Sequence, residues 1–193
     1  MPGVTTVLGL LNKPALVPWA NRLGLEGIDA AKYRDNRGEI GTLAHELIMG
    51  DLLGVPCDTS EYSRQQIDAA GHSFAFYQDW CKGKILEPII LEFPMVSEKY
   101  RYGGTLDYYG KVNNVVTLLD YKTGGVWTEC YLQVSAYFNL LVENGFEPPE
   151  KITILSIPRD SGEQFQEIRF TNYKKGFQAF LLLRELYDLL KEF

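Results

Sequence analysis

The stretch YGGTLDYYGKVNNVVTLLDYKTG, from Tyr102 to Gly124, sets two aspartates and a lysine within apolar runs that favour β-strands. Asn113 and Asn114 separate the two runs, and asparagine adopts positive φ more readily than most residues. The stretch therefore predicts a β-hairpin with a two-residue turn, whose strands cover about 100–109 and 115–122.

The register of this hairpin places its charged residues on one face. A two-residue turn sets Val112 opposite Val115, and counting outward then sets Asp107 opposite Asp120. Lys122 shares the face of Asp120, because side chains alternate along a strand. Directly opposite residues have Cβ atoms roughly 4.5–5.5 Å apart, so two facing carboxylates require a cation or a shared proton. Mg²⁺ or Mn²⁺ suits such oxygen ligands and would activate a water molecule that Lys122 orients or deprotonates.

These carboxylates are open to two alternative interpretations. In the first, the hairpin lies on the surface and its aspartates face solvent, but Leu106, Val116, Leu118 and Leu119 indicate a largely buried sheet. In the second, the pair belongs to a retaining glycosidase, whose carboxyl groups lie about 5–5.5 Å apart. That chemistry does not call for a lysine on the same strand face.

Further polar residues lie on predicted helices. His45 belongs to RGEIGTLAHELI, residues 37–48, and its imidazole is either an additional metal ligand or a hydrogen-bonded structural group. Glu46 lies about 100° around that helix, so we interpret it as a supporting or surface group. Gln133 and Tyr137 are four residues apart on one helical face. They either bind a phosphate or a DNA end, or belong to an amphipathic boundary stripe.

Glu92 and Glu98 flank the strand that precedes the hairpin. Either would add a carboxylate if it faced the aspartates. We interpret both as surface charges, since isolated glutamates are mostly exposed.

The order of the expected elements predicts the fold class. Helices are expected at about 5–11, 17–23, 37–53, 61–82, 128–144 and 173–193. Strands are expected at about 85–96, 100–109, 115–122, 151–157 and 165–170. Helices, a run of strands, one helix and further strands predict an α/β (α+β) fold with a central mixed sheet flanked by helices. We expect one domain over 1–193, helical to about 83 and sheet-based from about 84.

Composition limits the function classes. The chain has 193 residues, 46% of them hydrophobic, and a formal net charge of −6. That charge argues against a basic protein that coats nucleic acid, but not against an enzyme that acts on it. No apolar run reaches about 18 residues and the N-terminus lacks signal-peptide features, so we expect a cytoplasmic protein without membrane contact. The basic residues that could contact DNA are mostly N-terminal: Lys13, Arg22, Lys32, Arg34, Arg37 and Arg64.

Four motifs together resemble those of the PD-(D/E)XK nuclease superfamily. GTLAHE, GGTLD, LLDYKTG and QVSAY occur in this order between Gly41 and Tyr137, about half of the chain. The match is similar to the RecB-type branch, which includes phage exonucleases. VTTVLGLLNKPALVPWANRLG, at the N-terminus, also resembles the opening of phage-type members. The resemblance implies a restriction-endonuclease-like core.

The resemblance also implies roles for individual residues. His45, Asp107, Asp120 and the carbonyl of Tyr121 would bind the metal, and Lys122 would act on the water nucleophile. Gln133 and Tyr137 would orient the substrate. Branch members with an iron–sulfur cluster use four cysteines around the core. The three cysteines here, Cys57, Cys81 and Cys130, are widely scattered, so we expect no cluster.

These observations lead to the hypothesis of a Mg²⁺- or Mn²⁺-dependent DNA exonuclease of phage or bacterial recombination. It would act on linear or single-stranded DNA ends, alone or with a helicase or a single-strand annealing partner. One alternative is a catalytically silent nuclease-like module that binds DNA or a protein. Another is a metal-dependent hydrolase of a different phosphate ester.

Overall fold

A computed structural model describes residues 1–193. The helices are α1 (Val4–Leu8), α2 (Leu16–Leu25), α3 (Ala30–Leu53), α4 (Arg64–Cys81), α5 (Thr128–Glu143) and α6 (Tyr173–Leu189), followed by a 3₁₀ turn, Leu190–Glu192. The strands are β1 (Leu86–Ser97), β2 (Tyr102–Val112), β3 (Val115–Thr123), β4 (Lys151–Ile157) and β5 (Gln166–Phe170). No helix has both the length and the apolar character needed to cross a membrane.

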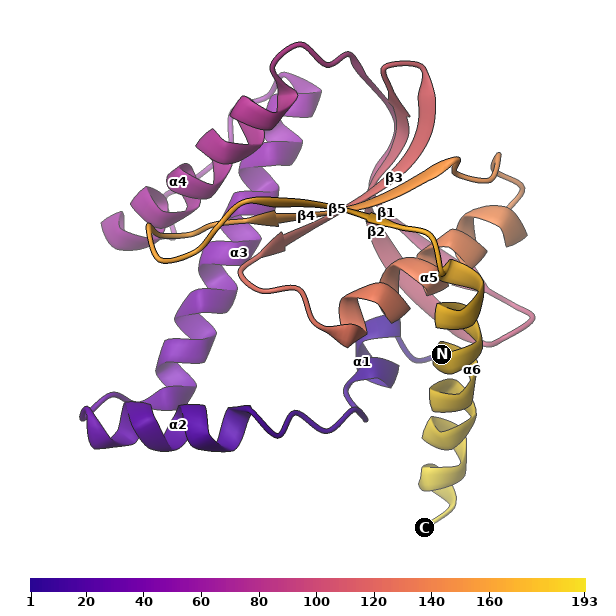
Figure 1. The fold of residues 1–193 in the computed structure, drawn as a ribbon, viewed down its shortest axis with the longest axis horizontal. Coiled ribbons are helices and arrows are strands. Elements are labelled where there is room, and N and C mark those ends of the chain that lie inside the picture. Colours follow the sequence, from indigo (N-terminus) through magenta and orange to yellow (C-terminus); the bar gives the residue numbers. More distant parts are fainter.

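The strands form one mixed sheet in the order β1-β2-β3-β4-β5. β3 and β4 run parallel and are joined through α5, while the other neighbouring strands are antiparallel. Helices α3 and α4 cover one face, and α1, α5 and α6 cover the other (Figure 1). The expected α/β class, with a central mixed sheet flanked by helices, is confirmed.

Alternating side chains of β3 supply both layers of the core. Val116 and Leu118 pack into the larger cluster, which includes residues of α1, α5 and α6. Leu119 and Tyr121 pack into the second cluster, with residues of α3 and α4. Because β3 is buried on both faces, its polar residues Asp120 and Lys122 are also held inside the protein.

The predicted hairpin turn is confirmed. Asn113 and Asn114 have φ of 52° and 64°, and Val112 pairs with Val115. Positive φ at both central residues is the type I′ pattern, which matches the twist of the flanking strands. Asn113 has a second role, since its Oδ1 accepts a hydrogen bond of 2.8 Å from the backbone N–H of Ile85.

The backbone pairing of β2 with β3 ends at Tyr108 and Leu119. The expected cross-strand pair of Asp107 and Asp120 lies one step beyond this last pair. There the N–H of Tyr121 donates to the Asp107 side chain, Oδ2, at 2.7 Å. The two strands therefore separate at the aspartates, and a carboxylate replaces the backbone acceptor.

Several helix ends differ from those expected. Helix α3 begins at Ala30, seven residues before the expected start, because the Asp29 carboxylate accepts hydrogen bonds from the N–H groups of Ala31 and Lys32. The first turns of α3 are polar and show no apolar period, so periodicity carries no signal there. α6 ends at Leu189, short of the expected 193, and a 3₁₀ turn follows.

The turn geometry predicts opposite effects for two substitutions at Asn114. Asn114→Gly keeps the positive φ without steric conflict and should leave the free energy of unfolding unchanged or slightly raised. Asn114→Ala should lower it by about 1 kcal/mol, because alanine lacks the short polar side chain that lets asparagine tolerate a positive φ. Urea denaturation measures both. As a control, Asn113→Gly keeps the turn but loses the bond to Ile85, so it should cost about 1 kcal/mol; equal stability of all variants would contradict the type I′ assignment.

Candidate metal centre

The peptide of Tyr121 is held on both sides by side chains from other elements. Asp107, on β2, accepts its N–H at 2.7 Å, and His45, on α3, donates from Nε2 to its carbonyl oxygen at 3.1 Å. The rings of His45 and Tyr121 also meet edge-to-face, with centroids 5.8 Å apart. This arrangement brings together three residues that the sequence predicts as metal ligands.

Helix α3 approaches the sheet closely because of Gly41, one turn before His45. A Cβ at this position would lie 2.8 Å from Oγ1 of Thr123, at the end of β3. The close approach brings the imidazole to the strand, and its hydrogen bond to Tyr121 leaves Nδ1 turned toward the carboxylates. A histidine fixed in this way through one nitrogen is oriented to ligate through the other.

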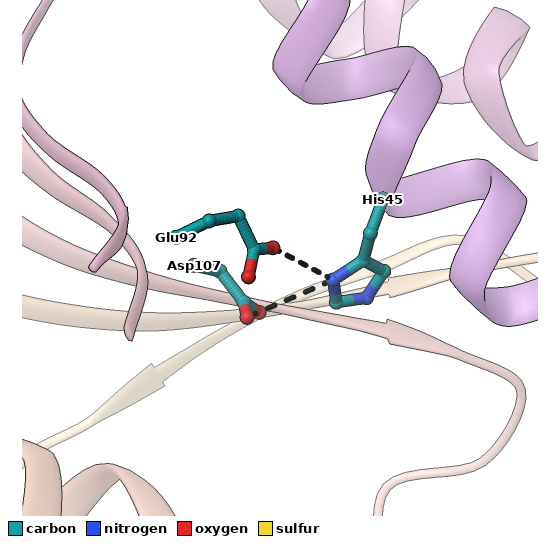
Figure 2. Close-up of side chains that lie close together, drawn as sticks. All are labelled: His45, Glu92 and Asp107. Carbon is teal, nitrogen blue, oxygen red and sulfur yellow. Dashed lines mark ion pairs between the residues drawn. The ribbon is translucent and has the colours of Figure 1, made fainter. Parts of the chain in front are cut away.

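Glu92 is a member of this site, and its interpretation as a surface charge is wrong. It lies within β1, between the pairs Leu91–Tyr108 and Phe93–Leu106, and its φ is 44°. Its Oε1 lies 3.5 Å from Nδ1 of His45 (Figure 2). A left-handed residue in a strand interrupts the alternation of faces. The apolar pattern around Glu92 therefore carries no signal of its direction.

His45, Glu92 and Asp107 form a group that can hold a metal ion. One ligand atom from each lies within 4.8 Å of the other two, and Figure 2 shows the three side chains converging from α3, β1 and β2. Asp107 contributes Oδ1, which lies 3.7 Å from Nδ1 of His45. Two carboxylates and one imidazole are ligands that Mn²⁺ and Mg²⁺ accept.

Asp120 and Lys122 form a buried ion pair beside this group. The Asp120 side chain is fully buried, and its Oδ2 lies 2.6 Å from Nζ of Lys122. Its Oδ1 has no partner in the protein. Burial raises the pKa of Asp120 to about 6, with Lys122 opposing and Asp107 adding to this rise. An unpaired, buried carboxylate oxygen fits a site that takes a cation.

The charge state of Lys122 limits its chemistry. Burial alone would lower its pKa, but the carboxylates of Asp120 and Asp107 outweigh burial and raise it above the ordinary value. In the metal-free protein Lys122 therefore carries its proton and can donate hydrogen bonds and supply positive charge.

Gln133 and Tyr137 are brought together on α5 as their spacing predicts. Nε2 of Gln133 donates to the Tyr137 hydroxyl at 2.8 Å. Tyr137 is buried, with its ring packed so closely on β2 that a Cβ at Gly104 would lie 2.6 Å from Cε1. Gln133 is half-buried. The contact with solvent in this pair is therefore made mainly by Gln133, which Tyr137 holds in place.

A depression of about 430 Å³ adjoins the metal-binding group on the α3 side. It is lined by Gly41, Thr42, His45, Glu46, Met49 and Glu92. The Glu46 carboxylate accepts a hydrogen bond of 3.2 Å from the Tyr62 hydroxyl, and Glu46 does not belong to the metal-binding group.

Most of the basic residues expected near DNA are paired with acids. Lys13 binds Glu129 at 2.8 Å, Arg34 binds Asp35 at 2.7 Å, and Arg64 binds Asp68 at 3.0 Å. Arg37 binds Asp160 and Glu163. Arg22 and Lys32 make no ion pair. The N-terminal part therefore presents less free positive charge than its composition suggests.

No protein-family model matches the chain, and no curated protein matches its sequence. Two solved structures with a related arrangement are a "Putative exonuclease" from Eubacterium rectale and a protein named SSO0001. The first has a TM-score of 0.43 and 12% identity, over 92% of this chain and 67% of that one. The second has a TM-score of 0.35 and 16% identity, over 79% and 73%. Scores of this size establish neither a shared family nor a shared activity.

The geometry predicts that Glu92 contributes to metal affinity. Mn²⁺ should raise the melting temperature of the protein, because an ion that binds only the folded state stabilises it. Glu92→Gln and Asp107→Asn should each weaken Mn²⁺ binding at least about tenfold, measured by titration calorimetry. Glu98→Gln makes the same charge change at an exposed position and should bind Mn²⁺ as the unsubstituted protein does. Equal affinities of the Glu92 and Glu98 variants would exclude Glu92 from the site.

The pKa of His45 predicts a proton release on metal binding. Burial lowers this pKa, but Asp107 and the hydrogen bond to Glu92 outweigh burial and raise it from 6.5 to about 9. A pKa raised in the folded state stabilises the metal-free protein fully below pH 6.5, and this contribution disappears as the pH rises through about 9.

Because an imidazole must be neutral to ligate a metal ion, Mn²⁺ binding near pH 7.5 should release about one proton from His45. Calorimetry in two buffers of different ionisation enthalpy counts that proton. His45→Asn should abolish the release. A release that persists in this variant would place the proton elsewhere.

Proposed function

We propose that the chain is a Mg²⁺- or Mn²⁺-dependent nuclease that hydrolyses phosphodiester bonds of DNA. The observation that carries this proposal is that Asp107 and His45 both form hydrogen bonds with the Tyr121 peptide. The residues before and after Tyr121, Asp120 and Lys122, form an ion pair beside it. It supports the proposal because three elements, α3, β2 and β3, bring their charged and polar residues to one place.

The side chains present fit a divalent ion. His45, Asp107 and Asp120 would hold it, and Glu92 would add a further carboxylate. The Tyr121 carbonyl, which the motif resemblance also implies as a ligand, accepts from Nε2 of His45 and would reach the ion bound at Nδ1 only after the ring turns. The unpaired Oδ1 of Asp120 supports this assignment, because a buried oxygen without a partner is otherwise unfavourable. When bound, the ion would polarise the scissile phosphoryl group and lower the pKa of a water molecule.

Lys122 would orient or deprotonate the water nucleophile, and its positive charge would stabilise negative charge on the substrate. Its ion pair with Asp120 keeps its amino group beside the ligands. A fixed cation beside a phosphate stabilises the charge that develops in the transition state. Gln133, oriented by Tyr137, would hydrogen-bond a non-bridging oxygen or a terminal group of the strand.

Action at DNA ends, within phage or bacterial recombination, is the narrower form of the proposal. It is supported by the order of the four motifs and the phage-like N-terminal stretch. Together with the ligand set, these features favour a single nuclease domain that acts alone or with a helicase or annealing partner.

The proposal predicts that linear duplex DNA is degraded with Mg²⁺ or Mn²⁺ and is left intact in EDTA. Lys122→Ala and Asp107→Asn should each reduce the rate about a hundredfold or more, because the first removes a cation beside the developing negative charge and the second removes a metal ligand. Gel electrophoresis of labelled linear DNA measures the loss.

A matched control separates this loss from a general charge effect. Lys111→Ala removes one lysine of β2 next to the hairpin turn, at the end away from Asp107, and should leave the rate within about twofold. Closed circular duplex serves as the second substrate. Its cleavage would show an endonuclease, while full activity in Lys122→Ala would refute the assignment.

A further inference from the structure

Two arginines from different elements converge on one glutamate near the end of β3. Nη2 of Arg37, on α3, lies 3.0 Å from Oε1 of Glu163, and Nη2 of Arg159 lies 2.7 Å from the same oxygen. Nη1 of Arg37 also binds Asp160 at 2.8 Å. Asp160 and Glu163 belong to the turn between β4 and β5, which thereby reaches across to α3.

The position of Arg159 ties this cluster to the candidate metal centre. Its guanidinium lies against Gly124, two residues beyond Lys122, so closely that a Cβ at Gly124 would collide with it. The carbonyl of Gly124 is fixed by a hydrogen bond of 2.7 Å from the Ser156 hydroxyl on β4. Arg159 is therefore held at the end of the strand that carries Asp120 and Lys122.

Arg37 is aligned with the metal-binding group along α3. Arg37, Gly41 and His45 follow each other at intervals of four residues and so share one face of the helix. Eight residues correspond to a rise of about 12 Å. Along B-form DNA this is a distance of about three to four phosphates of one strand. A strand that runs along α3 with its scissile phosphate at the metal centre can therefore reach Arg37 with a phosphate a few nucleotides away.

The carboxylate already bound there imitates a phosphate. Guanidinium groups bind carboxylates and phosphates through the same paired hydrogen bonds. Glu163 uses both oxygens: Oε1 accepts from the two guanidiniums, and Oε2 accepts from the backbone N–H of Arg159 at 2.8 Å. The side chains are 25% exposed for Arg37, 22% for Glu163 and 14% for Arg159, so the cluster is only partly open to solvent.

The acidic turn is compact and separable from the strands. Within it, the N–H of Gly162 donates to Oδ1 of Asp160 at 3.0 Å. The preceding strand is anchored independently, since the Ser73 hydroxyl donates to the carbonyl of Pro158 at 2.9 Å. The contacts that hold the end of β4 therefore do not involve Glu163 or Arg37.

We propose that Arg37 and Arg159 form a phosphate subsite for the DNA strand, and that Glu163, with Asp160, occupies this subsite in the free protein. DNA binding then exchanges an internal carboxylate for a backbone phosphate. The choice of DNA as the source of the phosphate rests on the proposed function. The β4–β5 turn acts as an internal competitor that weakens binding to any nucleic acid that cannot also reach the metal centre.

The test is the affinity of the full chain for a fluorescent duplex oligonucleotide, measured by anisotropy in EDTA at several salt concentrations. Glu163→Gln should bind about threefold to tenfold more tightly, because it removes the carboxylate shared by both arginines, leaves Arg37 with Asp160 alone and keeps the side-chain shape. Arg159→Ala and Arg37→Ala should bind more weakly. In each, the slope of log affinity against log salt should shrink by about one unit.

Asp79→Asn is the matched control. It makes the same change of charge and frees Lys82, an exposed partner at the C-terminal end of α4, so it should change the affinity less than about twofold. The gain from Glu163→Gln should also vanish when Arg159→Ala is added. Asp160→Asn, which leaves Glu163 in place, gives a second variant if Glu163→Gln lowers the melting temperature; it should tighten binding about twofold.

Unchanged or weaker binding in both acidic-turn variants, or a gain from Glu163→Gln equal to that of Asp79→Asn, would overturn the inference and leave the ion pairs with a structural role only. The assay needs neither metal nor cleavage. Arginine-dependent binding without any nuclease activity would refute the proposed function alone, and nuclease activity without this dependence would refute the inference alone.

Discussion

The candidate site depends on the peptide group of Tyr121. In an ordinary hairpin, the N–H of this residue would donate to the backbone of β2. Here the ladder ends at Tyr108 and Leu119, and the Asp107 carboxylate accepts that N–H instead. A hydrogen bond to a charged acceptor is stronger than the backbone bond it replaces. Asp107 therefore stabilises the separation of the two strands. His45 forms a hydrogen bond with the carbonyl on the other side of the same peptide.

The charges of the site are close to balanced without a metal. Glu92, Asp107 and Asp120 carry negative charge when ionised, while Lys122 and a protonated His45 carry positive charge. The raised pKa values of Lys122 and His45 follow from this neighbourhood. A divalent ion would replace the imidazole proton and would supply a partner for Oδ1 of Asp120. Buried carboxylates without any partner would be strongly unfavourable. Here Lys122 and the protonated His45 provide partners in the metal-free state.

The sequence predicts the parts of the fold that depend on local chemistry. The Asn113–Asn114 turn, the apolar strands and the order of elements follow from turn preference and periodicity, and β4 has the bounds that periodicity predicts. The direction of the Glu92 side chain cannot be predicted from periodicity, because its φ of 44° interrupts the alternation of faces along β1. The start of α3 does not follow either, since Asp29 caps a stretch without an apolar period. A motif resemblance places His45, Asp107 and Lys122 in order, but their contacts with Tyr121 and Asp120 exist only in the folded sheet.

An acidic chain that binds a polyanion must rely on local positive charge. The formal net charge of −6 repels DNA at a distance, and most N-terminal basic residues are neutralised by neighbours. Positive charge near the candidate metal centre comes from Lys122 and from the arginines at the end of β3. Since Arg37 and Arg159 hold Glu163 in the free protein, the proposed subsite would bind weakly to a nucleic acid that contacts it alone. A strand that reached a bound ion and the arginines together would gain both contacts at once. The acidic surroundings would then reduce overall affinity and favour the one register that places a phosphate at the candidate metal centre.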